Sequence, residues 1–76
     1  MRIDLFLKST RLIKRRSIAK EYCERSLVFI NSKVAKPSSE VKEGDKVEIT
    51  FGEKKVFVLA HISQVGNKER GDYERL

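Results

Sequence analysis

The sequence contains one cysteine, one proline and no tryptophan in 76 residues. The single Cys23 excludes an intramolecular disulfide, and without a second cysteine there is no zinc-binding pair of thiolates. This cysteine usage is typical of a reducing compartment, so we expect a cytoplasmic protein. No apolar run reaches the length of a membrane span or a signal-peptide core, because Asp4 interrupts residues 3–7 and Lys8 ends them. We therefore expect a soluble protein with no membrane partner.

The chain is also too short for most enzyme architectures. A length of 76 residues with 39% hydrophobic side chains supports one domain with a modest core. Such a core leaves little structure to wall off a reaction pocket, and no nucleophile elbow or glycine-rich phosphate loop is present. The lone His61 alternates on one strand face with Phe57 and Leu59, so we interpret it as a packed or edge residue. We expect no catalysis, no cofactor and no metal site.

Positive charge is abundant and unevenly placed. The formal net charge is +6, and the first twenty residues hold seven basic side chains against only Asp4, so they carry the whole excess. The remaining residues contain ten basic and ten acidic side chains. Such segregation creates a patch of positive potential that attracts polyanions. A polyanionic partner is the first hypothesis.

Two short helices are predicted near the N-terminus. Ile3, Phe6 and Leu7 fall at i, i+3 and i+4, the spacing that places three apolar side chains on one helical face. A second helix is expected to start with Ser17 as its N-cap and to end near Ser26. Its apolar stripe comprises Ile18, Ala19, Tyr22 and Cys23.

The rest of the chain has the pattern of a small antiparallel sheet. Residues 27–31 and 33–36 flank Asn31-Ser32, which resembles a two-residue hairpin turn. After a turn at Gly44-Asp45, residues 46–51 alternate in a strand, and residues 55–62 supply a last strand. We expect the aromatic residues in these patterns to be core residues first; they are Phe6, Tyr22, Phe29, Phe51 and Phe57.

The predicted fold class is therefore α+β, with two helices packed on a mostly antiparallel sheet. Residues 66–76 are polar and glycine-punctuated, with no apolar period to hold them on a core. We expect a domain over residues 1–65 followed by a flexible tail over residues 66–76. Tyr73 in that tail has no assigned function.

The basic residues lie where the second helix begins. A helix start presents unpaired backbone N–H groups and the positive end of the helix dipole, and here it follows Lys14, Arg15 and Arg16. Helix N-termini bind phosphate for this reason. The stretch "RLIKRRSIAKE" thus predicts a phosphate-binding corner.

At this point the sequence resembles the S4-type RNA-binding domain, also called the αL motif. The resemblance is carried by "RIDLFLK" over residues 2–8 and by "RLIKRRSIAKEYCERSLVFINSKVAKPSSEVKEGDKVEI" over residues 11–49, about two thirds of the chain. Free-standing domains that open in this way resemble the small S4-domain factor of bacterial ribosome-associated quality control. The matching positions are Arg2, Asp4, Arg15, Arg16, Ser17, Ala19, Asn31, Val34, Gly44 and Asp45. Ser26 and Ser32 stand where relatives usually carry Gly, so the helix C-cap and the hairpin turn are places where this chain could differ.

The resemblance implies a function and partners. It implies binding to a split large ribosomal subunit that carries a stalled peptidyl-tRNA, with contacts to ribosomal RNA and tRNA backbones. It also implies support for untemplated C-terminal tailing by a partner factor. We expect a ribosome-associated monomer.

The resemblance also implies a set of RNA-binding residues. Arg2, Arg15 and Arg16 are the first choices for phosphate contacts, since a guanidinium offers a planar fork to two phosphate oxygens. Asp4 is expected to be structural, either favouring the N-terminus of the first helix or orienting a neighbouring arginine. Supporting cations are Lys8, Arg11, Lys14, Lys20 and, ranked lower, Lys36 on the hairpin.

Three other functions remain open at this level. One is a heat-shock 15-type ribosome rescue or recycling factor, which is a relative with the same domain. A second is a protein adaptor whose basic patch meets an acidic protein surface. A third is a binder of anionic membranes, which is disfavoured because the second helix has only a narrow apolar stripe that is needed to cover the sheet.

Overall fold

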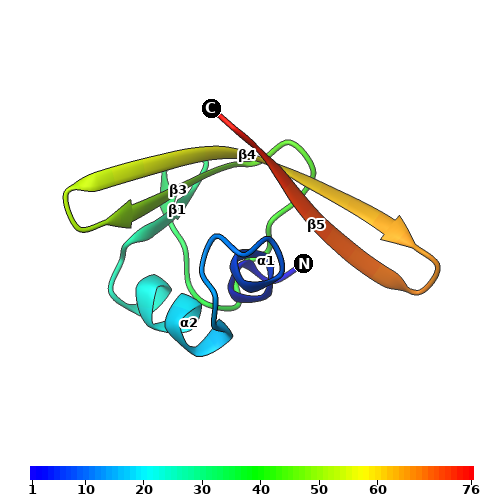
Figure 1. The fold of residues 1–76 in the computed structure, drawn as a ribbon, viewed down its shortest axis with the longest axis horizontal. Coiled ribbons are helices and arrows are strands. Elements are labelled where there is room, and N and C mark those ends of the chain that lie inside the picture. The colour runs from blue at the N-terminus through cyan, green and yellow to red at the C-terminus, as the bar shows by residue number, and fades with distance from the viewer.

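The protein folds as two helices against one five-stranded sheet. The computed structural model describes all residues 1–76. Every strand pairing is antiparallel, and the strand order is β2-β1-β3-β4-β5. The predicted α+β class is confirmed, and Figure 1 shows both helices on the same side of the sheet. The elements are α1 (Ile3–Ser9), α2 (Arg16–Glu24), β1 (Val28–Ile30), β2 (Lys33–Val34), β3 (Lys46–Phe51), β4 (Lys54–Val65) and β5 (Lys68–Arg75).

Helix α1 forms where the apolar spacing predicts it. Ile3, Phe6 and Leu7 are fully buried, so all three predicted core positions face the sheet and α2. The helix ends at Thr10, and the next residue, Arg11, has a φ of 63°. Because that left-handed conformation breaks the helical path, the chain turns back toward α2 at this point.

Helix α2 begins earlier than predicted. Its N-cap is Arg15, with an extended φ of −121°, and the Ala19 N–H already donates to the Arg15 carbonyl at 3.0 Å. The assignment of Ser17 as N-cap is therefore wrong, since Ser17 lies within the first turn. Ala19 and Cys23 face the core, whereas Ile18 from the predicted stripe remains 40% exposed.

The hairpin between β1 and β2 is confirmed. Asn31 and Ser32 have φ values of 49° and 70°, the two positive values of a type I′ turn. Ser26, which follows α2, has a φ of 60°. Ser26 and Ser32 thus both adopt the left-handed backbone conformation that favours glycine. The helix end and the hairpin turn therefore keep this conformation with serine in place of glycine.

The expectation of a flexible tail is wrong. Residues Lys68–Arg75 form β5, which pairs with β4 along its whole length through a turn at Gly66-Asn67. Gly71 explains this packing: a Cβ there would lie 3.0 Å from Phe6 Cδ1 and 3.1 Å from Met1 Sδ. The sequence pattern did not predict this strand, because few of its residues contact the core. The contact is made by Tyr73 and by the close approach that the absence of a side chain at Gly71 allows.

The core lies between the helices and the inner face of the sheet. Phe6 is buried, and Phe51 packs against the core with its ring centroid 5.7 Å from that of Tyr22. The core assignment is wrong for Phe29 and Phe57, which are aligned on either side of Glu48 on the outer face of the sheet. Alternation with a period of two residues separates the two faces of a strand. It does not show which face is buried in β1 and β4, because both faces of these strands carry apolar residues.

The β4–β5 hairpin projects beyond the helices. Residues 63–70 are all exposed, and Figure 1 shows this hairpin reaching past α1. Neither helix is long and apolar enough to span a membrane. Helix α1 contacts α2 on one side and β5 on the other.

Candidate nucleic-acid interface

Two basic side chains, Arg2 and Arg16, share one carboxylate. Asp4 is buried, with only 3% of its side chain exposed, and its Oδ2 accepts a hydrogen bond from Arg2 Nη2 at 3.1 Å. Arg16 Nε lies 3.5 Å from the same oxygen. The other carboxylate oxygen, Oδ1, accepts from the Leu5 N–H at 2.7 Å. Asp4 therefore joins α1 to the start of α2 and orients both guanidinium groups.

Each of these arginines keeps most of its hydrogen-bonding capacity. About half of each side chain is exposed, 50% for Arg2 and 49% for Arg16. A guanidinium has five N–H donors, so one contact with Asp4 leaves the others available. One carboxylate faces two guanidinium groups, and the arrangement keeps a net positive charge.

Backbone pairing fixes the position of Arg2. The Ile3 N–H donates to the Ser39 carbonyl at 2.8 Å, and the Val41 N–H donates to the Met1 carbonyl at 2.9 Å. These bonds hold the N-terminal residues against the loop after β2. Arg2 and Lys36 consequently line one depression beside the end of α2.

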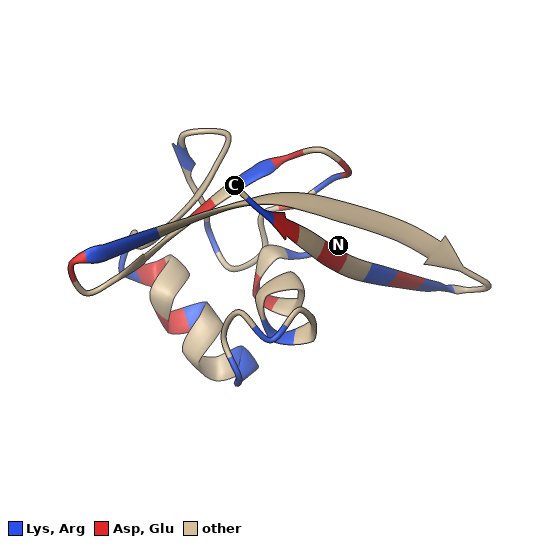
Figure 2. Cartoon of the chain, turned by 45° about the horizontal axis from the view of Figure 1, so that its top comes forward, with Lys and Arg blue, Asp and Glu red and all other residues tan.

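The start of α2 adds further positive charge. Arg15 is the N-cap and is exposed, and no side chain caps the first turn. Lys14 immediately precedes it and is also exposed. Figure 2 shows blue segments around the connection between the two helices, where this positive charge gathers.

The remaining predicted residues lie elsewhere. Lys8, Arg11 and Lys14 line a second depression at the C-terminal end of α1. Lys20 lies on the exposed face of α2 and lines neither depression. The eight predicted cations are thus divided between the two ends of α1, with Lys20 apart from both groups.

Ion pairing distinguishes these cations. Only Arg2 and Arg16 have an acidic partner within 4 Å, and that partner is Asp4. The side chains without one are Lys8, Arg11, Lys14, Arg15, Lys20 and Lys36. Arg2 and Arg16 therefore differ from the other six cations in having a carboxylate that orients them.

One further cation in this region was missed by the sequence analysis. Arg70 on β5 lines a depression together with Arg11, which follows α1. Residues 68–75 have no alternating apolar pattern, because most of their side chains are charged and the inner contact of the strand includes Gly71. A strand pattern without a run of apolar residues gave no reason to place Arg70 beside the N-terminal helix.

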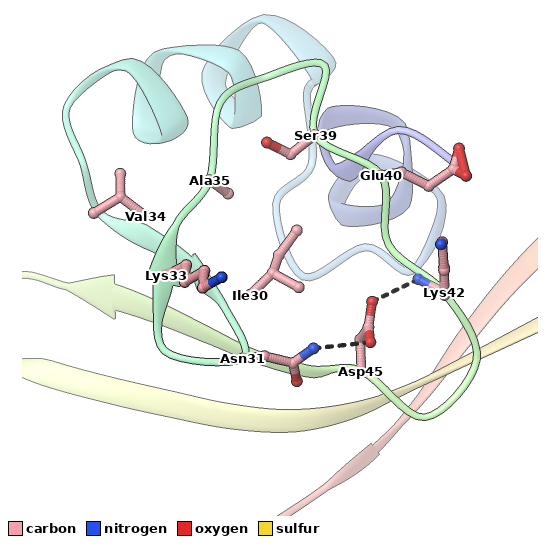
Figure 3. A pocket seen from close by; sticks show the side chains of 9 residues that line it. All are labelled: Ile30, Asn31, Lys33, Val34, Ala35, Ser39, Glu40, Lys42 and Asp45. Carbon is pink, nitrogen blue, oxygen red and sulfur yellow. Dashed lines mark hydrogen bonds between the residues drawn. The ribbon is translucent and has the colours of Figure 1, made fainter.

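A separate depression lies between the β1–β2 hairpin and the loop before β3 (Figure 3). Asn31 Nδ2 donates to Asp45 Oδ1 at 2.9 Å, and the Lys42 N–H donates to Asp45 Oδ2 at 2.8 Å. The Lys46 N–H donates to Asn31 Oδ1 at 2.9 Å. Asn31 and Asp45 therefore hold the hairpin to the loop, which gives these two residues a structural role.

Three titratable residues, His61, Glu43 and Cys23, have shifted pKa values. His61 Nδ1 lies 2.8 Å from Glu43 Oε2, and its Nε2 lies 3.6 Å from Glu74 Oε1. The hydrogen bond with Glu43 raises the pKa of His61 and lowers that of Glu43. Burial raises the pKa of the Cys23 thiol to about 11, so this cysteine is unreactive at neutral pH.

Comparison with known proteins shows the family of the chain. The model of the S4 domain family matches residues 1–47. A protein of Halalkalibacterium halodurans named RQC P-site tRNA stabilizing factor is 49% identical over 70 residues, which cover 91% of this chain and 80% of that protein. A Bacillus subtilis protein of the same name is 52% identical over 58 residues, covering 76% of this chain and 67% of the relative.

A solved structure matches the whole fold. Heat Shock Protein 15 of Vibrio cholerae, described as trimeric, superposes with a TM-score of 0.81 at 26% sequence identity. The match covers 100% of this chain and 81% of the other. It includes the region that follows residues 1–47, where the family model ends. The predicted resemblance is confirmed, and the chain belongs to the S4 domain family.

Proposed function

We propose that this protein is a non-enzymatic RNA-binding factor of ribosome-associated quality control. In this role it binds the large ribosomal subunit that carries a stalled peptidyl-tRNA and stabilises the tRNA in the P site. The names of relatives that are 49% and 52% identical support this role. The observation that carries it is the buried carboxylate of Asp4, which orients the exposed Arg2 and Arg16.

The proposed mechanism is recognition of folded RNA through its phosphates. Arg2, Arg15 and Arg16 donate paired hydrogen bonds to phosphate oxygens, and the uncapped start of α2 lies beside them. Because Asp4 orients two of the three guanidinium groups before binding, less side-chain entropy is lost when RNA binds. Supporting charges come from Lys8, Arg11, Lys14, Lys20 and Lys36.

The contacts proposed here carry little sequence information. Phosphate contacts set the position and orientation of a protein on a nucleic acid, and double-stranded RNA is recognised largely by its shape. A surface of this kind suits a junction of ribosomal RNA and tRNA, in which two structured backbones lie close together. We propose contacts with both RNAs, and support for C-terminal tailing by a partner factor once the peptidyl-tRNA is held.

The test is the binding of purified protein to large subunits carrying peptidyl-tRNA at several salt concentrations. If about five cations engage phosphates, the slope of log affinity against log salt is roughly −4 to −5 by the rule for duplex DNA. The double variant Arg15→Ala, Arg16→Ala should reduce this slope by about two units, and Arg2 still pairs with Asp4. The matched control is Arg25→Ala, Arg75→Ala, which removes the same charge from exposed positions outside the cluster.

Two results would contradict this function. One is an affinity for large subunits that does not depend on salt. The other is unchanged binding by the Arg15, Arg16 variant when its circular dichroism spectrum shows that it is folded. If nuclease-treated lysate still yields a specific partner in a pull-down, the protein is an adaptor for another protein.

A second candidate is rescue or recycling of the kind expected for heat-shock 15-type proteins. The likeness to Heat Shock Protein 15, with a TM-score of 0.81 over the whole chain, favours it. The two candidates share the RNA surface and differ in outcome. Loss of the protein should abolish C-terminal tailing of stalled chains under the first candidate, whereas under the second it should leave tailing intact and slow the clearance of blocked large subunits.

A further inference from the structure

The start of α1 is capped by the loop between β2 and β3, residues 35–45, which we call the capping loop. The first N–H groups of a helix have no carbonyl partner within the helix itself. Here the Ile3 N–H donates to the Ser39 carbonyl at 2.8 Å. The Asp4 N–H donates to the Pro37 carbonyl at 3.3 Å. Because no side chain caps this helix, two backbone carbonyls of the capping loop take the place of a capping side chain.

The same loop fixes the backbone of Arg2 from both sides. Arg2 forms an isolated antiparallel bridge with Glu40. The Ile3 N–H bond to the loop follows Arg2, and the bond from the Val41 N–H to the Met1 carbonyl, at 2.9 Å, precedes it. Val41 is fully buried, so this part of the loop is packed into the core. The capping loop therefore sets the position from which the Arg2 guanidinium extends.

Asp45 anchors the C-terminal end of the capping loop. Its carboxylate accepts hydrogen bonds from Asn31 Nδ2 at 2.9 Å and from the Lys42 N–H at 2.8 Å (Figure 3). Its backbone N–H donates to the Lys42 carbonyl at 3.0 Å, and its carbonyl accepts from the Ala60 N–H on β4 at 2.8 Å. Lys42 directly follows Val41, so Asp45 holds the loop next to the bond that reaches the N-terminal segment.

Ser39 anchors the other half of the capping loop. Its Oγ accepts the Lys36 N–H at 2.8 Å, and its own N–H donates to the Lys36 carbonyl at 2.9 Å. This closed turn presents the Ser39 carbonyl to the start of α1. Neither the Ser39 nor the Asp45 side chain forms a hydrogen bond or an ion pair with the Arg2 side chain, whose partner is Asp4. Any effect of these two side chains on Arg2 therefore passes through the loop backbone.

We propose that Asp45 and Ser39 are positioning residues for RNA binding, which act on Arg2 through the capping loop. This inference rests on the proposed function and gives a part in RNA binding to two side chains that carry no positive charge. The path is a continuous series of hydrogen bonds and peptide units, from Asp45 through Lys42 and Val41 to the residue before Arg2. A contact held in place by such supporting bonds loses less conformational entropy when the ligand binds.

The first test compares two aspartates. Asp45→Ala should weaken binding to large subunits carrying peptidyl-tRNA by about fivefold, although the net charge rises by one. Asp72→Ala is the matched control, because it makes the same charge change and Asp72 also accepts a backbone N–H, that of Tyr73, outside the capping loop. It should bind at least as tightly as the unaltered protein, since added positive charge favours RNA. Equal affinities of the two variants would overturn the inference.

The second test is a double-mutant cycle with Arg2→Ala. In the Arg2→Ala background, Asp45→Ala should weaken binding by less than about twofold, because the contact that it positions is already lost. A substitution that only loosens the fold would cost the same factor in both backgrounds, and that result would overturn the inference. Unchanged binding by Arg2→Ala alone would instead overturn the proposed phosphate contact of Arg2, and the inference with it.

The third test uses Ser39 and gives the same answer if Asp45→Ala does not fold. Ser39→Ala removes the hydroxyl acceptor and should weaken binding by about fivefold, whereas Ser39→Thr keeps a hydroxyl and should restore most of the affinity. Amide hydrogen exchange of Ile3 and Val41 in the free protein should be faster in Ser39→Ala and unchanged in Asp72→Ala. Unaltered exchange and unaltered binding in Ser39→Ala would overturn the role of the capping loop.

Discussion

Arg16, at the start of α2, lies with its Nε 3.5 Å from Oδ2 of the buried Asp4 on α1. The acidic residue thus lies between two basic side chains, where it also accepts a hydrogen bond from Arg2. Its negative charge opposes RNA binding through long-range electrostatics. Its geometry favours binding, because it holds the guanidinium groups in place.

The substitution Asp4→Asn separates these two effects. We expect RNA binding to weaken by about tenfold although the net charge rises by one, because the two arginines lose their orientation. The free energy of unfolding should fall by about 1–3 kcal/mol, since a buried charged acceptor is lost. Binding to large subunits and urea denaturation are the measurements.

The control for this prediction is Glu53→Gln. Glu53 lies in the exposed β3–β4 turn and has no ion-pair partner, so its substitution changes the charge alone. If Asp4→Asn binds as tightly as Glu53→Gln, the carboxylate does not orient the site.

A second prediction concerns the packing of β5. Gly71→Ala places a methyl group 3.0 Å from Phe6 Cδ1, and we expect it to reduce the free energy of unfolding by about 1–3 kcal/mol through overpacking. Amide hydrogen exchange should show the largest loss of protection in β5 and in its partner residues on β4. Lys68→Ala, at an exposed position on the same strand, should have little effect. Equal stability of the two variants would mean that β5 is not held by this contact.

A third prediction concerns the serines with positive φ. Ser26→Gly and Ser32→Gly should each stabilise the protein by up to about 1 kcal/mol, because glycine adopts these conformations without steric cost. Ser38→Gly, in an exposed loop without a positive φ, should be neutral or destabilising. Thermal denaturation measures all three. A lower midpoint for both Ser26→Gly and Ser32→Gly would be incompatible with strain at these positions.

The pH dependence of stability provides a fourth prediction. The pKa of His61 is raised from 6.5 by Glu43, so its contribution is fully present below pH 6.5 and is lost as the pH rises through the folded value. The pKa of Glu43 is lowered from 4.5, so its contribution is present above pH 4.5 and is lost as the pH falls through its folded value. The pair should therefore stabilise the loop before β3 most between these limits.

The substitution His61→Gln tests this pair. The urea midpoint of the unaltered protein should fall as the pH rises above 6.5, and that decrease should be smaller in the variant. An identical pH dependence of the two midpoints would exclude His61 as its source.

Local sequence patterns predicted most of the first 62 residues. Spacing of Ile3, Phe6 and Leu7 located α1, and Asn31-Ser32 located the hairpin, because each signal depends on neighbouring residues. The strand β5 was missed because its packing depends on Gly71, whose useful property is the absence of a side chain. Contact with Phe6 joins positions that are far apart in the sequence.

The candidate site was also predicted only in part, because some of its features depend on contacts between distant parts of the sequence. Charge segregation predicted the basic surface, and the resemblance predicted the orienting role of Asp4. Neither predicted that residues 69–72 lie beside Arg11 at the end of α1, because that proximity depends on the path of β5. Nor did the pattern reveal the positive φ of Arg11, since it is set by the turn between the two helices.

The outer strand β5 also has a consequence for self-association. Its free edge belongs to an eight-residue strand, the kind of edge that commonly pairs with another polypeptide and begins aggregation. Here six of the eight side chains are charged, three of each sign, so an approaching strand would have to desolvate several ions. The charged composition of β5, which gave no strand pattern in the sequence, thus protects the free edge of the sheet from pairing with another polypeptide.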